Sequence, residues 1–251
     1  LETYELLNGF SPSETDIALG TAGMGYKHAV VAGNRKAYIA NVRLTDPDGE
    51  VSTRADLMIA SLPNRFDTFL WSNRIEVAID DGDEITGLVY FADRILQFKR
   101  NRLYIINVSQ NIEFLESTHE HAGARGQHAI CKFEDGVLWV NDNGIYIYDG
   151  ERVIDVTINQ KTKSRRLNWG SDYYSDIDNV AIGYHPASKI AVIALDTSAV
   201  YPSDALLFHI PTGAFTLGSE KLRNPMAWCG RFETDTDGWV KVDMDAMVRN
   251  T

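Results

Sequence analysis

The sequence predicts an all-β fold. Its ordered-looking segments are short, rich in β-branched and aromatic residues, and bounded by turn residues, as at residues 37–42, 74–79 and 144–148. Turn pairs such as Asn143-Gly144 and Asp149-Gly150 punctuate them. No stretch of about 12 residues or more has a convincing helical period. Strands joined by tight turns therefore account for most of the chain.

One unit recurs along the chain: an apolar strand, a polar turn and a second apolar strand. The units begin near residues 29, 87, 129, 180 and 226, at steps of 58, 42, 51 and 46 residues. In three of them another strand follows, at residues 103–108, 145–148 and 205–210. Four short strands in about 40–50 residues is the size of a propeller blade. We therefore expect a β-propeller of about five to seven blades, built from antiparallel hairpins.

The composition is that of a globular protein with a substantial core. The chain has 251 residues, of which 44% are hydrophobic and 24% charged. No apolar run approaches the roughly 18 residues that a membrane-spanning helix needs. We expect residues 1–251 to form a single propeller domain that does not bind a membrane. Because the sequence opens on Leu1 rather than Met, it is also expected to be a processed chain or part of a longer one.

The charge balance argues against non-specific binding of nucleic acid. The 24 Lys and Arg residues are outnumbered by 35 Asp and Glu residues, which gives a net charge of -11. The two cysteines, Cys131 and Cys229, fit neither a disulfide framework nor a metal-binding pattern. They fall at similar places in their units, just before a turn, and are interpreted as small buried side chains.

The sequence contains no complete motif for catalysis. Residues 234–239 resemble a sialidase-type turn but carry Thr236 where an Asp is required, and no G-x-S-x-G elbow occurs. The glycines of residues 20–25 lack the Lys-Ser/Thr pair of a phosphate loop. The acidic turns at residues 46–50 and 80–84 do not match the twelve-residue calcium loop. We therefore expect no catalysis, no cofactor and no metal.

Histidines gather in one polar segment. His119 and His121 would point the same way in an extended chain and could share a metal with nearby His128 or Glu116. Residues 113–126 are, however, polar and aperiodic, which is typical of a long exposed loop. His119 and His121 are therefore interpreted as solvated or contact-making residues.

A basic cluster precedes an aromatic segment. Its members are Lys161, Lys163, Arg165 and Arg166, and Trp169 follows them. Basic residues near aromatic ones can contact nucleic acid or protein. On a chain this acidic, we favour a protein-contact loop over DNA contact.

Two consecutive units carry a family resemblance. The first contains Asp93-Arg94-Ile95-Leu96-Gln97-Phe98 and Arg102-Leu103-Tyr104, and the second contains Gly136-Val137-Leu138-Trp139 and Gly144-Ile145-Tyr146-Ile147-Tyr148-Asp149-Gly150. Their order and spacing resemble the β-propeller of tailed-bacteriophage virion proteins, in the tail nozzle (tail tubular protein B-like) and packaged-DNA-stabilisation groups. Residues 189–195 and 204–216 resemble the next blade. Gln127-His128-Ala129 departs from the small hydroxyl residue expected there.

The resemblance implies a structural virion component without catalysis: a tail nozzle, tail hub or head-to-tail connector ring. It implies a homo-oligomeric ring, expected to be a hexamer, that takes part in tail assembly in the host cytoplasm and in DNA ejection. Segments 54–69, 113–126 and 159–175 would contact neighbouring copies or other tail or connector proteins, and packaged DNA would pass without specific binding.

The alternative is a ligand- or glycan-binding propeller, such as a receptor-recognition protein. It would use aromatic side chains on one face, with Trp139, Trp169 and Trp228 as candidates. Core packing explains Trp139 and Trp228 better, because both lie within repeated strands.

Overall fold

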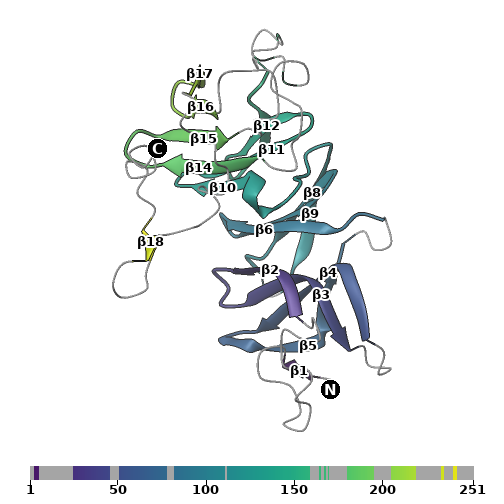
Figure 1. Cartoon of the computed structure of the whole chain (residues 1–251). Helices are drawn as coiled ribbons and strands as arrows, with labels where there is room; N and C mark the ends of the chain where they lie inside the picture. Colours follow the sequence, from purple (N-terminus) through teal and green to yellow (C-terminus); the bar gives the residue numbers. More distant parts are fainter. Residues whose placement is uncertain are drawn as a thin grey trace. The chain divides into compact units, whose positions relative to one another are not determined.

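The fold is all-β and is made of consecutive antiparallel sheets (Figure 1). The computed structural model describes residues 3–5, 25–45, 51–77, 82–110, 112–158, 164, 167, 169, 180–194, 205–218, 233–234 and 240–241. The chain divides into two compact units, Leu1–Ala124 and Arg125–Thr251. The expectation of one domain over residues 1–251 stays a prediction.

The first unit opens with a five-stranded sheet in the order β1-β5-β4-β3-β2. Its strands are β1 (Thr3–Glu5), β2 (Gly25–Val31), β3 (Ala37–Thr45), β4 (Val51–Leu62) and β5 (Arg65–Glu76). β2 to β5 form an antiparallel meander, and β1 pairs only with residues 68–70 of β5. Beyond Leu70, β5 is therefore paired on one side only among the described residues.

The second sheet of this unit is a four-stranded meander in sequence order. It comprises β6 (Ile85–Phe91), β7 (Arg94–Lys99), β8 (Arg102–Asn107) and β9 (Phe114–Glu120). The β6–β7 turn is Ala92-Asp93, and both residues have positive φ, 50° and 57°. That geometry belongs to the two-residue hairpin turn whose twist matches its strands. Tight turns of this kind keep the four strands in one compact blade.

The second unit repeats the same construction twice. One sheet contains β10 (Ile130–Phe133), β11 (Gly136–Asn141), β12 (Gly144–Tyr148) and β13 (Val153–Asp155), and a 3-10 turn at Gln127–Ala129 precedes it. The next contains β14 (Ala181–His185), β15 (Ile190–Ala194), β16 (Ala205–His209) and β17 (Ala214–Leu217). A two-stranded ladder pairs β18 (Glu233–Thr234) with β19 (Val240–Lys241).

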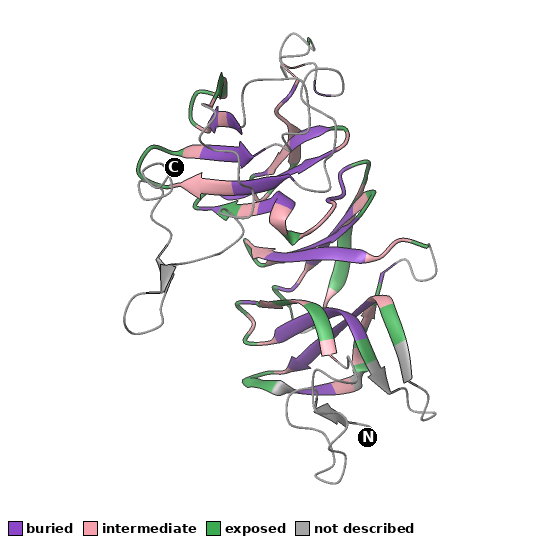
Figure 2. Cartoon of the chain, in the orientation of Figure 1, coloured by how far each residue is buried: buried purple, intermediate pink, exposed green. Residues whose placement is uncertain are grey.

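Neighbouring sheets within each unit pack face to face through apolar side chains. In the first unit, one cluster joins Tyr38 and Met58 of the first sheet to Ile95 and Ile106 of the second. In the second unit, Leu138, Val140, Ile193 and Phe208 belong to one cluster with Trp169. Burial is deepest on the central strands (Figure 2). Strands buried on both faces need apolar residues at consecutive positions, which explains the short β-branched runs of the sequence.

The strand–turn–strand repeat predicted from the sequence is confirmed for its first four copies. Those beginning near residues 29, 87, 129 and 180 coincide with β2, β6, β10 and β14, the first strands of their meanders. The further strands predicted at 103–108, 145–148 and 205–210 are β8, β12 and β16. Within the fifth copy of the repeat, the described residues contain only the strands β18 and β19. The all-β fold with propeller-type sheets is therefore confirmed.

Two of the segments that were predicted to be long inserts are wrong, because they form strands. Residues 54–69 are not a loop, because they belong to the long strands β4 and β5 and the turn at Pro63-Asn64 between them. Residues 114–120, expected within a long exposed loop, form β9. β9 is the last strand of its sheet and largely exposed, so it needs no regular apolar alternation. Most of the insert at 159–175 lies outside the described residues.

One buried side chain in the second sheet lacks partners. Gln97 of β7 is wholly buried, and neither atom of its amide group has a hydrogen-bond partner among the described residues. A buried amide without a partner costs about 1–3 kcal/mol. We expect Gln97→Met, which keeps length and volume, to raise the free energy of unfolding by about 1 kcal/mol.

Urea denaturation of the wild type and the Gln97→Met variant measures this change. The control is Thr86→Val, since the buried Thr86 hydroxyl donates to the carbonyl oxygen of Ala124 at 2.6 Å. Thr86→Val should lower stability by about 1 kcal/mol. A loss of stability in Gln97→Met as well would mean that the amide is partnered in solution.

Candidate functional site

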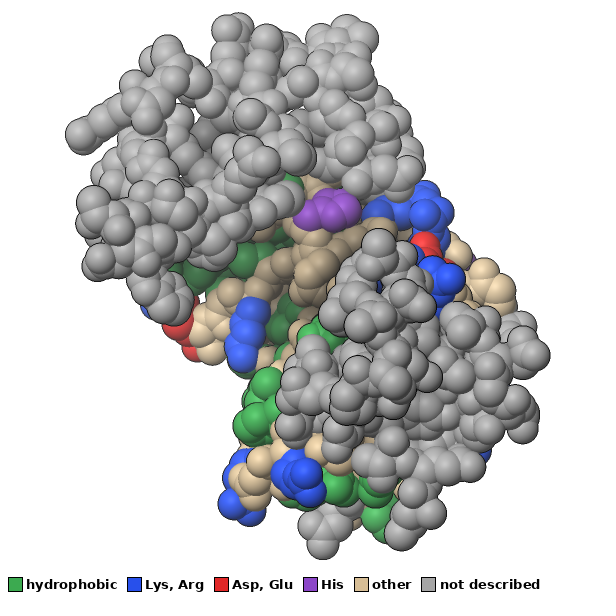
Figure 3. All heavy atoms as spheres, turned by 60° about the horizontal axis from the view of Figure 1, so that its bottom comes forward, with side chains coloured by type: hydrophobic (Ala, Val, Ile, Leu, Met, Phe, Trp, Pro, Cys, Tyr) green, Lys and Arg blue, Asp and Glu red, His purple; other side chains and the backbone are tan. Residues whose placement is uncertain are grey.

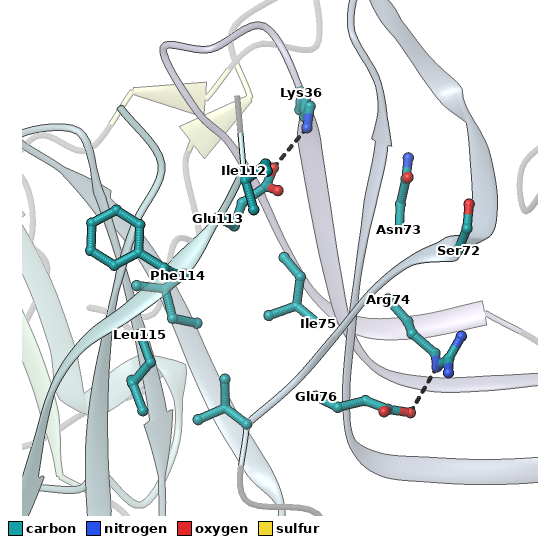
Figure 4. A pocket seen from close by; sticks show the side chains of 12 residues that line it. Lys36, Ser72, Asn73, Arg74, Ile75, Glu76, Ile112, Glu113, Phe114 and Leu115 are labelled. Atoms are coloured by element: carbon teal, nitrogen blue, oxygen red, sulfur yellow. Dashed lines mark hydrogen bonds and ion pairs between the residues drawn. The ribbon is translucent and has the colours of Figure 1, made fainter. Parts of the chain in front are cut away.

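A cavity of about 580 Å³ lies in the first unit between β5 and the start of β9. One wall is the Ser72–Val77 stretch of the chain, and the other is formed by Ile106 and the residues around Phe114. Lys36, from the β2–β3 turn, lies at one end (Figure 4). We call this cavity the β5–β9 groove. It is bordered by two strand segments that have partners on only one side among the described residues.

A largely buried ion pair closes one end of the groove. Lys36 Nζ lies 2.7 Å from Glu113 Oε1, and the two side chains are 15% and 13% exposed. Tyr38 Oη donates to the same carboxylate oxygen at 2.8 Å, and Asn34 Nδ2 donates to Tyr38 Oη at 2.6 Å. This chain of contacts ties the β2–β3 hairpin of the first sheet to the entrance of β9 in the second.

The surroundings shift the pKa values of this network. Burial alone would raise the pKa of Glu113, but the hydrogen bonds from Lys36 and Tyr38 outweigh it, so the pKa lies below its ordinary value. The pKa of Tyr38 is raised, first by burial and then by its bond to the Glu113 carboxylate. At neutral pH, Glu113 is therefore a carboxylate that already has its donors, and Tyr38 is a neutral hydroxyl.

The rest of the groove combines a second ion pair with apolar side chains. Arg74 Nε lies 2.9 Å from Glu76 Oε1 on β5. Ile75 lies between the two pairs (Figure 4). Ile112, just before β9, and Phe114 and Leu115, the first two residues of β9, are 78%, 43% and 47% exposed. All four charged side chains that line the groove are thus paired with each other, and the rest of its lining mixes the polar Ser72 and Asn73 with apolar side chains.

The sequence did not predict this groove, although residues 113–115 of its lining fall in the segment 113–126 that was expected to contact other subunits. Ile112, Phe114 and Leu115 are apolar residues inside a polar segment, and that contrast was the available signal. The partnership of Lys36 with Glu113 joins residues that are 77 positions apart. Only the packing of the two sheets brings them together, and no local pattern indicates it.

The structure places the predicted contact residues apart from this groove. His119 lies in β9, half-buried, with Nε2 at 3.2 Å from the Ser117 hydroxyl oxygen. His121 follows the end of β9 with a φ of 62° and is exposed. The left-handed residue breaks the extended run that would have aligned the two imidazoles. In the described part of the chain, no group of three or more His, Cys, Asp and Glu side chains is placed to hold a metal ion.

Trp169 was expected in a protein-contact loop, but its side chain is only 3% exposed and packs in the core of the second unit. Its Nε1–H donates to the carbonyl oxygen of Asn141 at 2.8 Å, which satisfies the indole in that apolar setting. The basic residues Lys161, Lys163, Arg165 and Arg166 lie outside the described residues.

Aromatic and thiol side chains of the described blades serve packing. Trp139 is wholly buried, so neither it nor Trp169 offers a ring face to a ligand, and Trp228 lies outside the described residues. Cys131 is half-buried rather than buried, and burial raises the pKa of its thiol to about 11. A thiol with that pKa is a poor nucleophile at neutral pH. Cys229 lies outside the described residues.

Many basic side chains of the described residues are already matched by acidic ones. On the face drawn in Figure 3, Lys and Arg side chains occur at several separate places. Ion pairs involve Lys27, Lys36, Arg74, Arg94, Arg100, Arg102, Arg125 and Arg152. Paired cations release fewer counterions on meeting phosphate and bind it weakly. No helix in the described part of the chain is both long and apolar enough to cross a membrane.

Comparison with known proteins shows structural similarity without a family match. No family model matches the chain, and no curated protein does. Among solved structures, the chain is similar to the WD40 domain of SCAP from fission yeast, with a TM-score of 0.42 and 7% sequence identity. The match covers 78% of this chain and 56% of that one, so the chain spans little more than half the length of the solved structure.

Acid is expected to destabilise the first unit in two steps. Burial lowers the pKa of His119 below 6.5, so the unfolded chain binds the proton more readily. The stability that depends on neutral His119 is complete above pH 6.5 and is lost as the pH falls from 6.5 toward the lower folded value. Glu113 and Glu116 have lowered folded pKa values, so their contribution is complete above pH 4.5 and is lost below it.

Denaturant midpoints at a series of pH values between 3 and 8 measure both steps. His119→Gln should reduce the upper step without abolishing it, because burial lowers the pKa of His28 in the same unit as well, and Glu113→Gln should reduce the lower step only. A midpoint that does not change between pH 7 and pH 5 in the wild type would contradict the role of His119.

Proposed function

We propose that the protein is a non-catalytic structural component of a tailed-phage virion. It acts as a ring of copies in the tail nozzle, tail hub or head-to-tail connector. The proposal rests first on the resemblance of two consecutive units to phage propeller blades. Each of these units folds as one complete four-stranded meander, β6 to β9 and β10 to β13.

The main support for a structural rather than a catalytic role is that the charged side chains of the β5–β9 groove are already held in ion pairs. A catalytic acid or base needs a group free to exchange a proton with a substrate. Here Glu113 is held by Lys36 and Tyr38, and Glu76 is held by Arg74. What the groove offers instead is three exposed apolar side chains at a strand edge, Ile112, Phe114 and Leu115, a surface suited to binding protein.

The acidic balance suits a ring through which DNA passes. With a net charge of -11 and many described cations already in ion pairs, few phosphates would be neutralised. DNA would then slide along such a wall rather than bind to it.

Light scattering after size-exclusion chromatography, with negative-stain imaging, tests the proposal on the purified full chain. A ring is expected, with a mass of about six times 28.1 kDa for a hexamer. A chain that stays monomeric at every concentration and binds oligosaccharides on a glycan array would overturn the proposal. That result would favour the alternative of a glycan-binding propeller.

A further inference from the structure

The β5 wall of the β5–β9 groove differs from its β9 wall, because it is mainly polar. Ser72 and Asn73 line it, and neither side chain has a hydrogen-bond partner among the described residues. Arg74 and Glu76 follow on the same strand, paired with each other but still 38% and 39% exposed. Figure 4 shows Ser72 and Asn73 on β5, across the groove from Glu113. This wall therefore presents several polar groups that a ligand can reach.

A bulge in β5 produces this polar wall. The β4–β5 ladder is paired at Arg74 and again at Phe69, but between these two positions β5 has the residues 70–73 where β4 has only Ala60. The additional residues of β5 leave the ladder with β4, and the two unpartnered polar side chains are among them. Bulges occur often beside functional sites, where they turn a side chain in a new direction. The bulge therefore marks this wall as a candidate binding surface.

The same irregularity argues against a peptide strand as the ligand of this wall. Strand addition depends on a regular row of backbone N–H and C=O groups along the edge of a sheet. β5 lacks such a row at residues 70–73, and β9 has a register shift of its own between Leu115 and Ser117. Both strands that border the groove are thus irregular where they line it. Recognition on the β5 wall therefore depends on side chains rather than on main-chain pairing.

These side chains select a ligand that is polar but uncharged. The four charges of the lining already form two ion pairs, so a charged ligand would lose water without gaining a dedicated counter-ion. An apolar ligand would cover the Ser72 hydroxyl and the Asn73 amide and leave them without partners. A hydroxyl group both donates and accepts, so it can bond to both of these groups and to either member of the Arg74–Glu76 pair. Sugars combine such hydroxyls with C–H faces that can pack on Ile75.

We propose that the β5–β9 groove binds a neutral oligosaccharide through Ser72, Asn73 and the Arg74–Glu76 pair. Its volume of about 580 Å³ lies within the range of small-molecule sites, which combine apolar walls with a few well-placed polar groups. The inference goes beyond the structural role proposed above, and it applies to a single copy as well as to a ring. In a ring each copy contributes one groove, so weak individual sites would act together on a polysaccharide surface.

An array of neutral and acidic glycans, followed by calorimetric titration of the glycans that bind, tests the site on the purified full chain. The wild type should bind neutral glycans and not acidic ones. Asn73→Leu should weaken that binding by about tenfold or more, because it removes an amide that bonds to the sugar. The matched control is Asn101→Leu, at an exposed asparagine of the β7–β8 turn that does not line the groove. Glu76→Gln removes one negative charge from the lining and should shift selectivity toward acidic glycans. Far-UV circular dichroism must show that all three variants are folded.

The outcomes separate this inference from the proposed function. A wild type that binds no neutral glycan on the array would overturn the sugar site, and intact rings in the same sample would leave the structural role standing. A monomer that binds neutral glycans would overturn the ring and support the site. Glycan binding that is the same in Asn73→Leu as in the control would mean that the sugar binds elsewhere and would overturn the assignment. Binding of an uncharged, strand-forming hexapeptide in place of glycans would identify a protein segment as the occupant and overturn the proposal as well.

Discussion

Trp139→Ala is expected to lower the free energy of unfolding by about 3–5 kcal/mol. Trp139 is the largest wholly buried side chain of the described residues and lies at the centre of β11. It stacks on Tyr146 of β12, with ring centroids 5.6 Å apart and planes at 16°. Alanine would remove this contact and leave a cavity that a close-packed sheet cannot fill by relaxation.

Equilibrium denaturation followed by circular dichroism measures the loss. Trp139→Phe keeps an aromatic ring and should cost less than the alanine variant. Tyr146→Ala is the second comparison, because Tyr146 is only half-buried and its removal leaves a smaller cavity. A loss below about 1 kcal/mol for Trp139→Ala would mean that the second unit is not packed as described.

The fold was largely predictable because each blade repeats the same local signals. Residues 136–148, for example, combine two β-branched and aromatic strands with the turn before Gly144, and they form β11 and β12 in full register. Such a hairpin is determined by neighbouring residues, so its sequence contains the information needed. β9 lacked that information, because a largely exposed edge strand needs no apolar alternation.

The candidate site was not predictable from local patterns. The Lys36–Glu113 pair depends on how the first two sheets of the chain pack, and neither residue belongs to a motif. For Trp169, the local sequence pattern was misleading rather than uninformative. Its basic neighbours suggested a protein-contact loop, but the core of the second unit offers it both apolar contacts and an acceptor in Asn141. A large aromatic side chain gains more by burial than by exposure when its N–H is satisfied.

Glu113→Ala is the second change with a large expected effect. It should lower the free energy of unfolding by about 3 kcal/mol, because Lys36 would keep a buried charge without its carboxylate. Tyr38 would also lose the acceptor of its hydroxyl proton. The value lies at the low end for buried pairs, since the two side chains are still 15% and 13% exposed. Urea denaturation of the purified variant measures it.

A double-mutant cycle tests whether the Lys36–Glu113 ion pair adds to stability or only offsets the cost of burying its own two charges. Lys36→Met removes the other charge, and Lys36→Met with Glu113→Ala removes both. Replacing both members of a buried pair by apolar groups is often nearly neutral. The double variant should therefore recover much of the stability that Glu113→Ala loses. The exposed pair Arg74–Glu76 supplies the control, since Glu76→Ala should cost less than about 1 kcal/mol. If the double variant is no more stable than Glu113→Ala alone, the cost arises from Tyr38 and the packing around it rather than from the stranded charge of Lys36.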